Sequence, residues 1–161
     1  MIVVSNTSPL TNLAAIGQFA LLHDLFGHLH VPTAVVHELA AGGKSWPGSA
    51  EVASATWITT HPIHNQTVVD VLRLDLDWGE AEALALAIQL KADLVLLDEQ
   101  TARYAAQYLN LRVMGVVGLL VRAKTIGLLP RIHPQLDALR EQAGFYLSEA
   151  VYREALRLAN E

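Results

Sequence analysis

The segment that decides the fold is Leu94-Val95-Leu96-Leu97-Asp98-Glu99, four apolar residues followed by two acids. Such a short apolar run is typical of a strand that is buried on both faces, as in parallel sheets. Ile2-Val3-Val4-Ser5-Asn6, near the start of the sequence, has the same character. Because ligands bind beyond the carboxyl ends of parallel strands, we expect Asn6 and Asp98 to lie at the same edge of one sheet.

Segments with helical spacing alternate with further short β-prone runs along the chain. We expect strands at 2–5, 29–31, 57–60, 94–97 and 112–114. We expect helices at 18–26, 32–39, 49–55, 67–74, 80–91, 99–109, 116–126, 134–143 and 148–159, and an earlier one capped by Ser8 with Pro9 in its first turn. This alternation predicts an α/β fold, with helices on both faces of a central, mainly parallel sheet of roughly five strands. We expect one domain over residues 1–161.

Composition limits the possible functions. The chain has 161 residues, of which 52% are hydrophobic and 17% charged, and it contains no cysteine. It can therefore bury a large core, and disulfides and thiolate metal sites are excluded. No apolar run approaches the roughly 18 residues of a membrane span, and the start has no basic region typical of a signal peptide. We therefore expect a cytoplasmic protein without a membrane partner.

Charge is distributed unevenly. The net charge is −5, which argues against a strongly basic nucleic-acid-binding module. Residues 1–90 contain two basic and eight acidic residues, a balance of −6, whereas residues 91–161 contain nine and eight, a balance of +1. If the protein binds a polyanion, the later half of the chain is therefore the expected contact surface.

Each candidate acid also has an ordinary structural explanation. Asp98 precedes a helix and is a good N-cap residue, a role compatible with a functional one. Asp77-Trp78-Gly79-Glu80 has the spacing of a capping box. Glu80 and Glu82 are two residues apart, so they point to opposite sides of a helix and only one can face the sheet edge. By itself, Glu38 is typical of a solvated carboxylate, and Glu99 suits a helix N-terminus.

The motifs of other chemistries are absent. The sequence contains no GxGxxG or GxxxxGK[ST] phosphate loop and no GxSxG nucleophile elbow. Its seven histidines include no HxxxH pair, and we interpret them as structural or surface residues. The chemistry that remains is a cluster of carboxylates that holds a hard divalent cation.

Five segments, taken in order, resemble the PIN-domain family, in particular relatives of the VapC-type toxins. These segments are Ile2 to Leu10, Val31 to Leu39, Gly79 to Ala87, Ala92 to Arg103 and Val113 to Lys124. The match runs from residue 1 to about 130 and is less distinct over the helices at 134–161. The resemblance implies a three-layer α/β/α fold whose acids hold Mg²⁺ or Mn²⁺ for the hydrolysis of RNA phosphodiester bonds.

The resemblance assigns roles to individual positions. The four acids of the family fall on Asn6, Glu38, Glu80 and Asp98. Glu82 competes with Glu80 as a metal ligand, and Glu99 is a further candidate ligand. The hydroxyl groups of Thr7 and Ser8 and the guanidinium of Arg103 are the implied substrate contacts. The resemblance also implies a cognate antitoxin protein and a homodimer as partners.

Position 6 departs from the family pattern, because Asn stands where the family has Asp. An Asn carbonyl can ligate a hard cation, but it brings no charge, and its NH₂ group is a donor where the family has an acceptor. Three interpretations stay open: a weakened nuclease, an inactive scaffold that binds an antitoxin or RNA, and a substitution introduced to make a toxic protein tolerable. A structural or small-molecule-binding α/β domain is the last alternative, and it predicts an apolar pocket at the strand edge.

Two helices have faces with more than one interpretation. The apolar helix 116–126 either packs in the core or, with the C-terminal helix, forms a dimer interface. Arg153 and Arg157 lie one turn apart, so they share a helix face that is either solvated or contacts RNA or an acidic partner.

Overall fold

Five strands form one sheet in which every neighbouring pair is parallel. The computed structural model describes residues 1–161. The strand order is β3 (Ile58–His61), β2 (Leu29–Pro32), β1 (Val3–Ser5), β4 (Leu94–Leu96), β5 (Val113–Met114). β1 is central and pairs with β4 in the register Ser5 to Leu96. The carboxyl ends of these two strands are thus neighbours, as the sequence predicts for residues 6 and 98.

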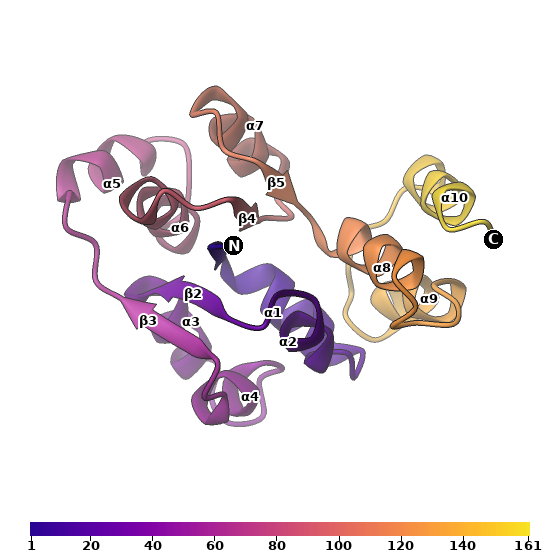
Figure 1. Ribbon diagram of the computed structural model, residues 1–161. Helices are drawn as coiled ribbons and strands as arrows, with labels where there is room; N and C mark the ends of the chain where they lie inside the picture. Colours follow the sequence, from indigo (N-terminus) through magenta and orange to yellow (C-terminus); the bar gives the residue numbers. More distant parts are fainter.

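Helices cover both faces of the sheet and complete a three-layer α/β/α fold (Figure 1). Successive strand residues point to opposite faces, so Val3 joins one core cluster and Val4 the other. One cluster is formed with α1 (Thr7–Ala15), α2 (Ala20–Phe26), α3 (Thr33–Ala41), α8 (Val116–Thr125), α9 (His133–Glu141) and α10 (Glu149–Leu158). The other is formed with α5 (Gln66–Leu72), α6 (Trp78–Leu90) and α7 (Gln100–Tyr108). The short α4 (Ser49–Ser54) precedes β3.

The predicted elements are all present, with shifts of one or two residues at most ends. The clearest correction is α1, which begins at Thr7 with Asn6 in the N-cap position, so Ser8 is not the cap. Pro9 is nevertheless in the first turn, where its missing N–H has no intrahelical partner to lose. Asn110 has φ of 58° and ends the helix before it, as predicted.

The last helices are part of the main core. Leu136 and Leu139 of α9 and Ala155 of α10 are buried in the cluster that contains Val3. The apolar helix α8 also buries its Leu119 and Leu120 in this cluster. Of the two interpretations of this helix given above, the structure shows packing in the core. Figure 1 shows α8, α9 and α10 together at the end of the molecule opposite α5 and α6. No helix has both the length and the hydropathy needed to span a membrane.

The carboxylate of Glu161 holds the start of α9. It accepts hydrogen bonds from the backbone N–H groups of Ile132 at 2.8 Å and His133 at 3.2 Å, and from Lys124 Nζ at 3.0 Å. Burial acts to raise the pKa of Glu161, but these hydrogen bonds and the charge of Lys124 lower it overall from its ordinary value of 4.5. An anion at a helix N-terminus is stabilising, so ionised Glu161 favours the folded state.

We predict that Glu161→Gln lowers the free energy of unfolding near neutral pH by about 1–3 kcal/mol, because three donors lose a charged acceptor. A carboxyl with a lowered folded-state pKa stabilises above pH 4.5, and this stabilisation disappears as the pH falls through the folded-state value. Urea unfolding of parent and variant should therefore differ near neutral pH and converge in acid.

Glu141→Gln is the matched control, since Glu141 is exposed and makes no hydrogen bond or ion pair. Equal losses for both variants, or a difference that persists in acid, would contradict the assigned role of Glu161.

Candidate active site

Asn6 lies at the centre of the candidate site, directly beyond the carboxyl end of β1. Its backbone N–H donates to the carbonyl of Leu96 at 3.1 Å, which extends the pairing with β4. Its side chain is 4% exposed, and its Oδ1 atom is buried without any hydrogen-bond partner. A buried carbonyl oxygen without a partner typically costs about 1–3 kcal/mol. Oδ1 is therefore the one buried side-chain nitrogen or oxygen atom in the protein that has no hydrogen-bond partner.

Asp98 follows β4 and binds two helix N-termini. Its Oδ1 accepts the backbone N–H of Val116 at 2.8 Å, and its Oδ2 accepts the hydroxyl of Ser8 at 2.9 Å and the amide of Asn12 at 3.3 Å. Burial raises the pKa of Asp98, and these hydrogen bonds together with the charge of Arg103 only partly offset the rise. The carboxylate thus holds α1 and α8 together at the sheet edge.

Glu38 and Glu82 cap one another's helices. Glu38 of α3 accepts the backbone N–H of Gly79, at the start of α6, at 3.0 Å, and also binds the hydroxyl of Thr7. Glu82 of α6 accepts the backbone N–H of Ala34, at the start of α3, at 2.9 Å. The second oxygen of Glu82 accepts the indole N–H of Trp78 at 3.1 Å. We call this arrangement the reciprocal cap.

Gly79 has no space for a side chain at the reciprocal cap. A Cβ atom at this position would overlap the carboxylate of Glu38. The glycine is therefore explained by the close approach of the Glu38 side chain to the first turn of α6.

Glu80 forms the predicted capping box with Asp77. Its N–H donates to Asp77 Oδ1 at 2.8 Å, and its Oε2 accepts the Asp77 N–H at 3.1 Å. Burial raises the pKa of Glu80; the Asp77 hydrogen bond opposes this, and the charges of Asp77, Glu99 and Glu38 add to the rise. Glu80 is thus within electrostatic reach of Glu38 and Glu99, and it has an oxygen with no hydrogen bond.

Glu99 and Arg103 lie on the helix that follows Asp98. Glu99 is exposed, occupies the N-cap position of α7 and makes no side-chain capping bond. Arg103 Nη1 lies 3.5 Å from the carbonyl of Leu97. A Cβ atom at position 115 would lie 2.7 Å from Arg103 Nη1 and 3.1 Å from Asp98 Oδ1, so Gly115 permits the approach of Arg103 to the site.

The structure therefore gathers Asn6, Thr7, Ser8 and Asp98 at the ends of the two central strands. Glu38 joins them through Thr7, and Glu80 through its charge interaction with Glu38. Both oxygens of Glu82 accept hydrogen bonds, from Ala34 at the start of α3 and from Trp78. No group of three or more acidic, histidine or cysteine side chains is arranged to hold a metal ion.

Asn12 is a further residue of the site, which the motifs above do not include; its amide donates to Ser8 Oγ at 3.0 Å and to Asp98. Its spacing of four residues from Ser8 is the signal that could have found it, since such residues share a helix face. A cavity of about 560 Å³ lies beside these residues, and its lining includes Ser8, Asn12, Asp98 and Glu99. The lining is mainly polar, unlike the apolar pocket expected for a small-molecule-binding domain.

Other candidate residues lie outside the site. Arg153 pairs with Glu149 and Arg157 pairs with Glu154, and both ion pairs lie along α10. These pairs agree with the interpretation of this helix face as solvated. His30 Nδ1 lies 2.8 Å from His61 Nε2 on the strands β2 and β3, and burial, with neighbouring histidine charges, lowers the pKa of both.

A comparison with curated proteins finds no match to this sequence. A comparison with protein families finds one whose model, described as a PIN domain, matches residues 2–161. PIN domains have a nuclease-type fold, commonly bind RNA and generally use divalent metal ions. The parallel five-stranded sheet and the polar residues at its carboxyl edge agree with this match. The chain therefore belongs to the PIN-domain family.

Proposed function

We propose that this protein is a Mg²⁺- or Mn²⁺-dependent ribonuclease of VapC toxin type that hydrolyses RNA phosphodiester bonds, and that Asn6 weakens it. The observation that carries the proposal is the free, buried Oδ1 of Asn6 at the carboxyl edge of the sheet. A hard cation is a suitable partner for a carbonyl oxygen that no protein group binds. Glu80, which has an oxygen without a hydrogen bond, and Asp98 are the carboxylates that would complete the donor set with it.

The residues present fit a hard divalent cation better than a soft one. Every candidate donor is an oxygen, and Mg²⁺ keeps several water ligands, so one amide and two carboxylates suffice. When bound, the cation would supply an activated water and neutralise charge on the scissile phosphate. The raised pKa values of Glu80 and Asp98 reflect negative charge held in a poorly solvated place, which a cation would compensate.

Several groups of the chain are suited to hold the RNA backbone. The N-termini of α1 and α8 meet at Asp98, and helix N-termini favour phosphate. The hydroxyl groups of Thr7 and Ser8 lie in the first turn of α1, where they donate to Glu38 and Asp98 and so hold these carboxylates at the helix N-terminus. Arg103 supplies a guanidinium beside Gly115. Glu38 positions Thr7 in this scheme and also fixes the start of α6.

The second candidate function is an inactive PIN scaffold that binds an antitoxin or RNA. It is favoured by the neutral Asn6 and by the fact that both oxygens of Glu38 and of Asp98 already accept hydrogen bonds from the protein. Under either function we propose a cytoplasmic protein with a cognate antitoxin and a homodimeric state.

We predict that Asn6→Asp raises the affinity for Mn²⁺ at least about tenfold, since even outer-shell partners of metal sites commonly contribute about 10- to 100-fold. The same variant should cleave RNA faster than the parent chain, and Asn6→Asp combined with Asp98→Asn should not cleave. Calorimetry with Mn²⁺ and gel assays with a mixture of RNAs measure the two effects.

Asn65→Asp is the matched control for added charge, because Asn65 is an exposed N-cap residue of α5 whose side-chain hydrogen bond is made within its own helix, to Val68. Ribonuclease action is contradicted if Asn6→Asp binds Mn²⁺ and cleaves none of the RNAs. Tight Mn²⁺ binding by the parent chain would count against the inactive scaffold.

In the Asn6→Asp background, we predict opposite effects for the two neighbouring acids of α6. Glu80→Gln should weaken Mn²⁺ binding with little loss of stability, because Gln also completes a capping box. Glu82→Gln should leave Mn²⁺ binding nearly unchanged and lower the free energy of unfolding by about 1–3 kcal/mol, since its NH₂ group would face the N–H of Ala34 or Trp78. Calorimetry and urea unfolding of the same samples separate these effects, and the reverse pattern would make Glu82 the ligand.

A further inference from the structure

An exposed tyrosine adjoins the candidate site. Tyr146 is 87% exposed and lies between α9 and α10. It lines the polar cavity of about 560 Å³ and also a second cavity of about 440 Å³. Asp98 and Gln100 line both cavities too. Tyr146 therefore shares these cavities with Asp98, a candidate metal ligand.

The backbone on both sides of Tyr146 is fixed. The N–H of Phe145 donates to the carbonyl of Leu139 at 2.9 Å, and Phe145 packs against the core. On the other side, Leu147 is buried. Its carbonyl accepts hydrogen bonds from Nη2 of Arg140 at 2.8 Å and from Nε of Arg140 at 3.3 Å. Tyr146 is therefore an exposed aromatic side chain on an ordered support.

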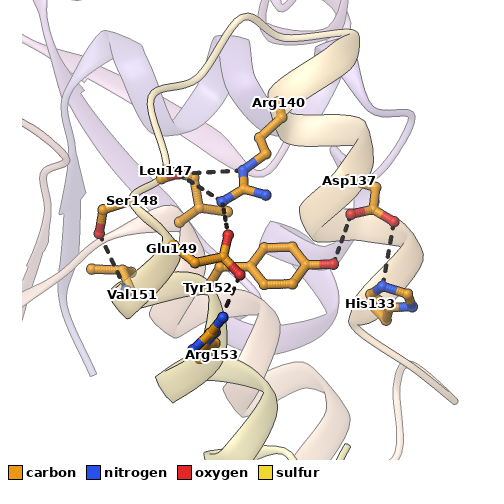
Figure 2. A network of polar contacts seen from close by, with 9 residues as sticks. All are labelled: His133, Asp137, Arg140, Leu147, Ser148, Glu149, Val151, Tyr152 and Arg153. Atoms are coloured by element: carbon orange, nitrogen blue, oxygen red, sulfur yellow. Dashed lines mark hydrogen bonds and ion pairs between the residues drawn. The ribbon is translucent and has the colours of Figure 1, made fainter.

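Arg140, which holds this support, is itself fixed by a polar network (Figure 2). Its guanidinium lies 4.3 Å from the centre of the Tyr152 ring, and Tyr152 donates to Asp137 at 2.8 Å. Burial and the contact with Asp137 raise the pKa of Tyr152 to about 12, so its hydroxyl keeps its proton. Ser148, next to Leu147, caps α10, because its hydroxyl oxygen accepts the N–H of Val151 at 3.2 Å.

The second cavity combines two kinds of wall. Val117, Phe145 and Leu147 supply apolar surface, while Arg103 supplies the only positive charge and Asp98 the only negative one. Its volume is within the range of about 300–1,000 Å³ typical of small-ligand pockets. An aromatic face and apolar walls beside a guanidinium suit a flat ring that carries a phosphate.

We propose that Tyr146 is a stacking platform for a nucleobase of single-stranded RNA, next to the phosphate held at the acidic site. This inference rests on the proposed function and deepens it. Stacking on an aromatic side chain is tolerant of sequence, because every base has a π-face. Arg103 contacts the phosphate that joins this nucleotide to the scissile one. Tyr146 is thus a positioning residue that sets where along a strand the cut falls.

The test measures binding of short, fluorescein-labelled single-stranded RNA by anisotropy, with Mn²⁺ present and with the parent chain to limit turnover. Tyr146→Ala should weaken binding about 5- to 150-fold, the fold-change that corresponds to one stacked base. Tyr146→Phe keeps the aromatic face and should bind like the parent. Tyr108→Ala is the matched control, since Tyr108 is 90% exposed at the end of α7 and lines neither cavity.

A series of RNAs, each with one abasic nucleotide, distinguishes stacking on Tyr146 from a purely structural role of this residue. One abasic position should weaken binding to the parent chain and leave binding to Tyr146→Ala unchanged. Equal binding by parent and Tyr146→Ala overturns the inference, as does an equal loss with Tyr108→Ala. If the parent binds RNA and Asn6→Asp cleaves it without any dependence on Tyr146, only the inference fails. If no chain binds RNA and Asn6→Asp does not cleave, both fail.

Discussion

The reciprocal cap between α3 and α6 is the interaction on which the geometry of the candidate site depends. Glu38 holds the first turn of α6 and Glu82 holds the first turn of α3, so neither helix can shift along the other without releasing a buried N–H group. A buried donor left unpaired in this way costs about 1–3 kcal/mol, which is more than the roughly 0.5–1.5 kcal/mol that a typical hydrogen bond contributes. The cap fixes Glu80, one residue beyond Gly79, relative to the strand ends.

Asp98 joins the starts of α1 and α8, as the reciprocal cap joins the starts of α3 and α6. Its two oxygens bind groups from both helices, so the helix N-termini converge on one carboxylate. The arrangement concentrates negative charge in a poorly solvated place, as the raised pKa values of Glu80 and Asp98 indicate. A carboxylate at position 6 would add to this repulsion in the absence of a cation, and Asn6 avoids it. By this argument the neutral residue favours folding in the absence of a bound cation.

The sequence was sufficient for the strands and for the placement of residues 6 and 98 at one sheet edge, because both depend on local patterns. Short apolar runs mark the two central strands, and strand ends at one edge bring residues 6 and 98 together. The sequence was insufficient where the choice of a site residue depends on a contact between helices. The choice between Glu80 and Glu82 turns on whether α3 presents Ala34 to α6, and this contact spans 48 residues of sequence. Tyr146 was missed for the same reason, since its distance from Asp98 is set by how α9 and α10 pack.

The carboxylates alone say little about catalysis, because each has a structural reason to be present. Glu38 and Glu82 cap helices, Glu80 completes a capping box, and Asp98 joins two helix N-termini. These hydrogen bonds would stabilise an inactive scaffold as well as a nuclease. Asn6 is different, since its side chain caps nothing and its buried Oδ1 contacts no donor. Asn6 is therefore the buried polar side chain of the site that no hydrogen bond of the fold requires, and its chemistry bears most directly on the choice between a nuclease and a scaffold.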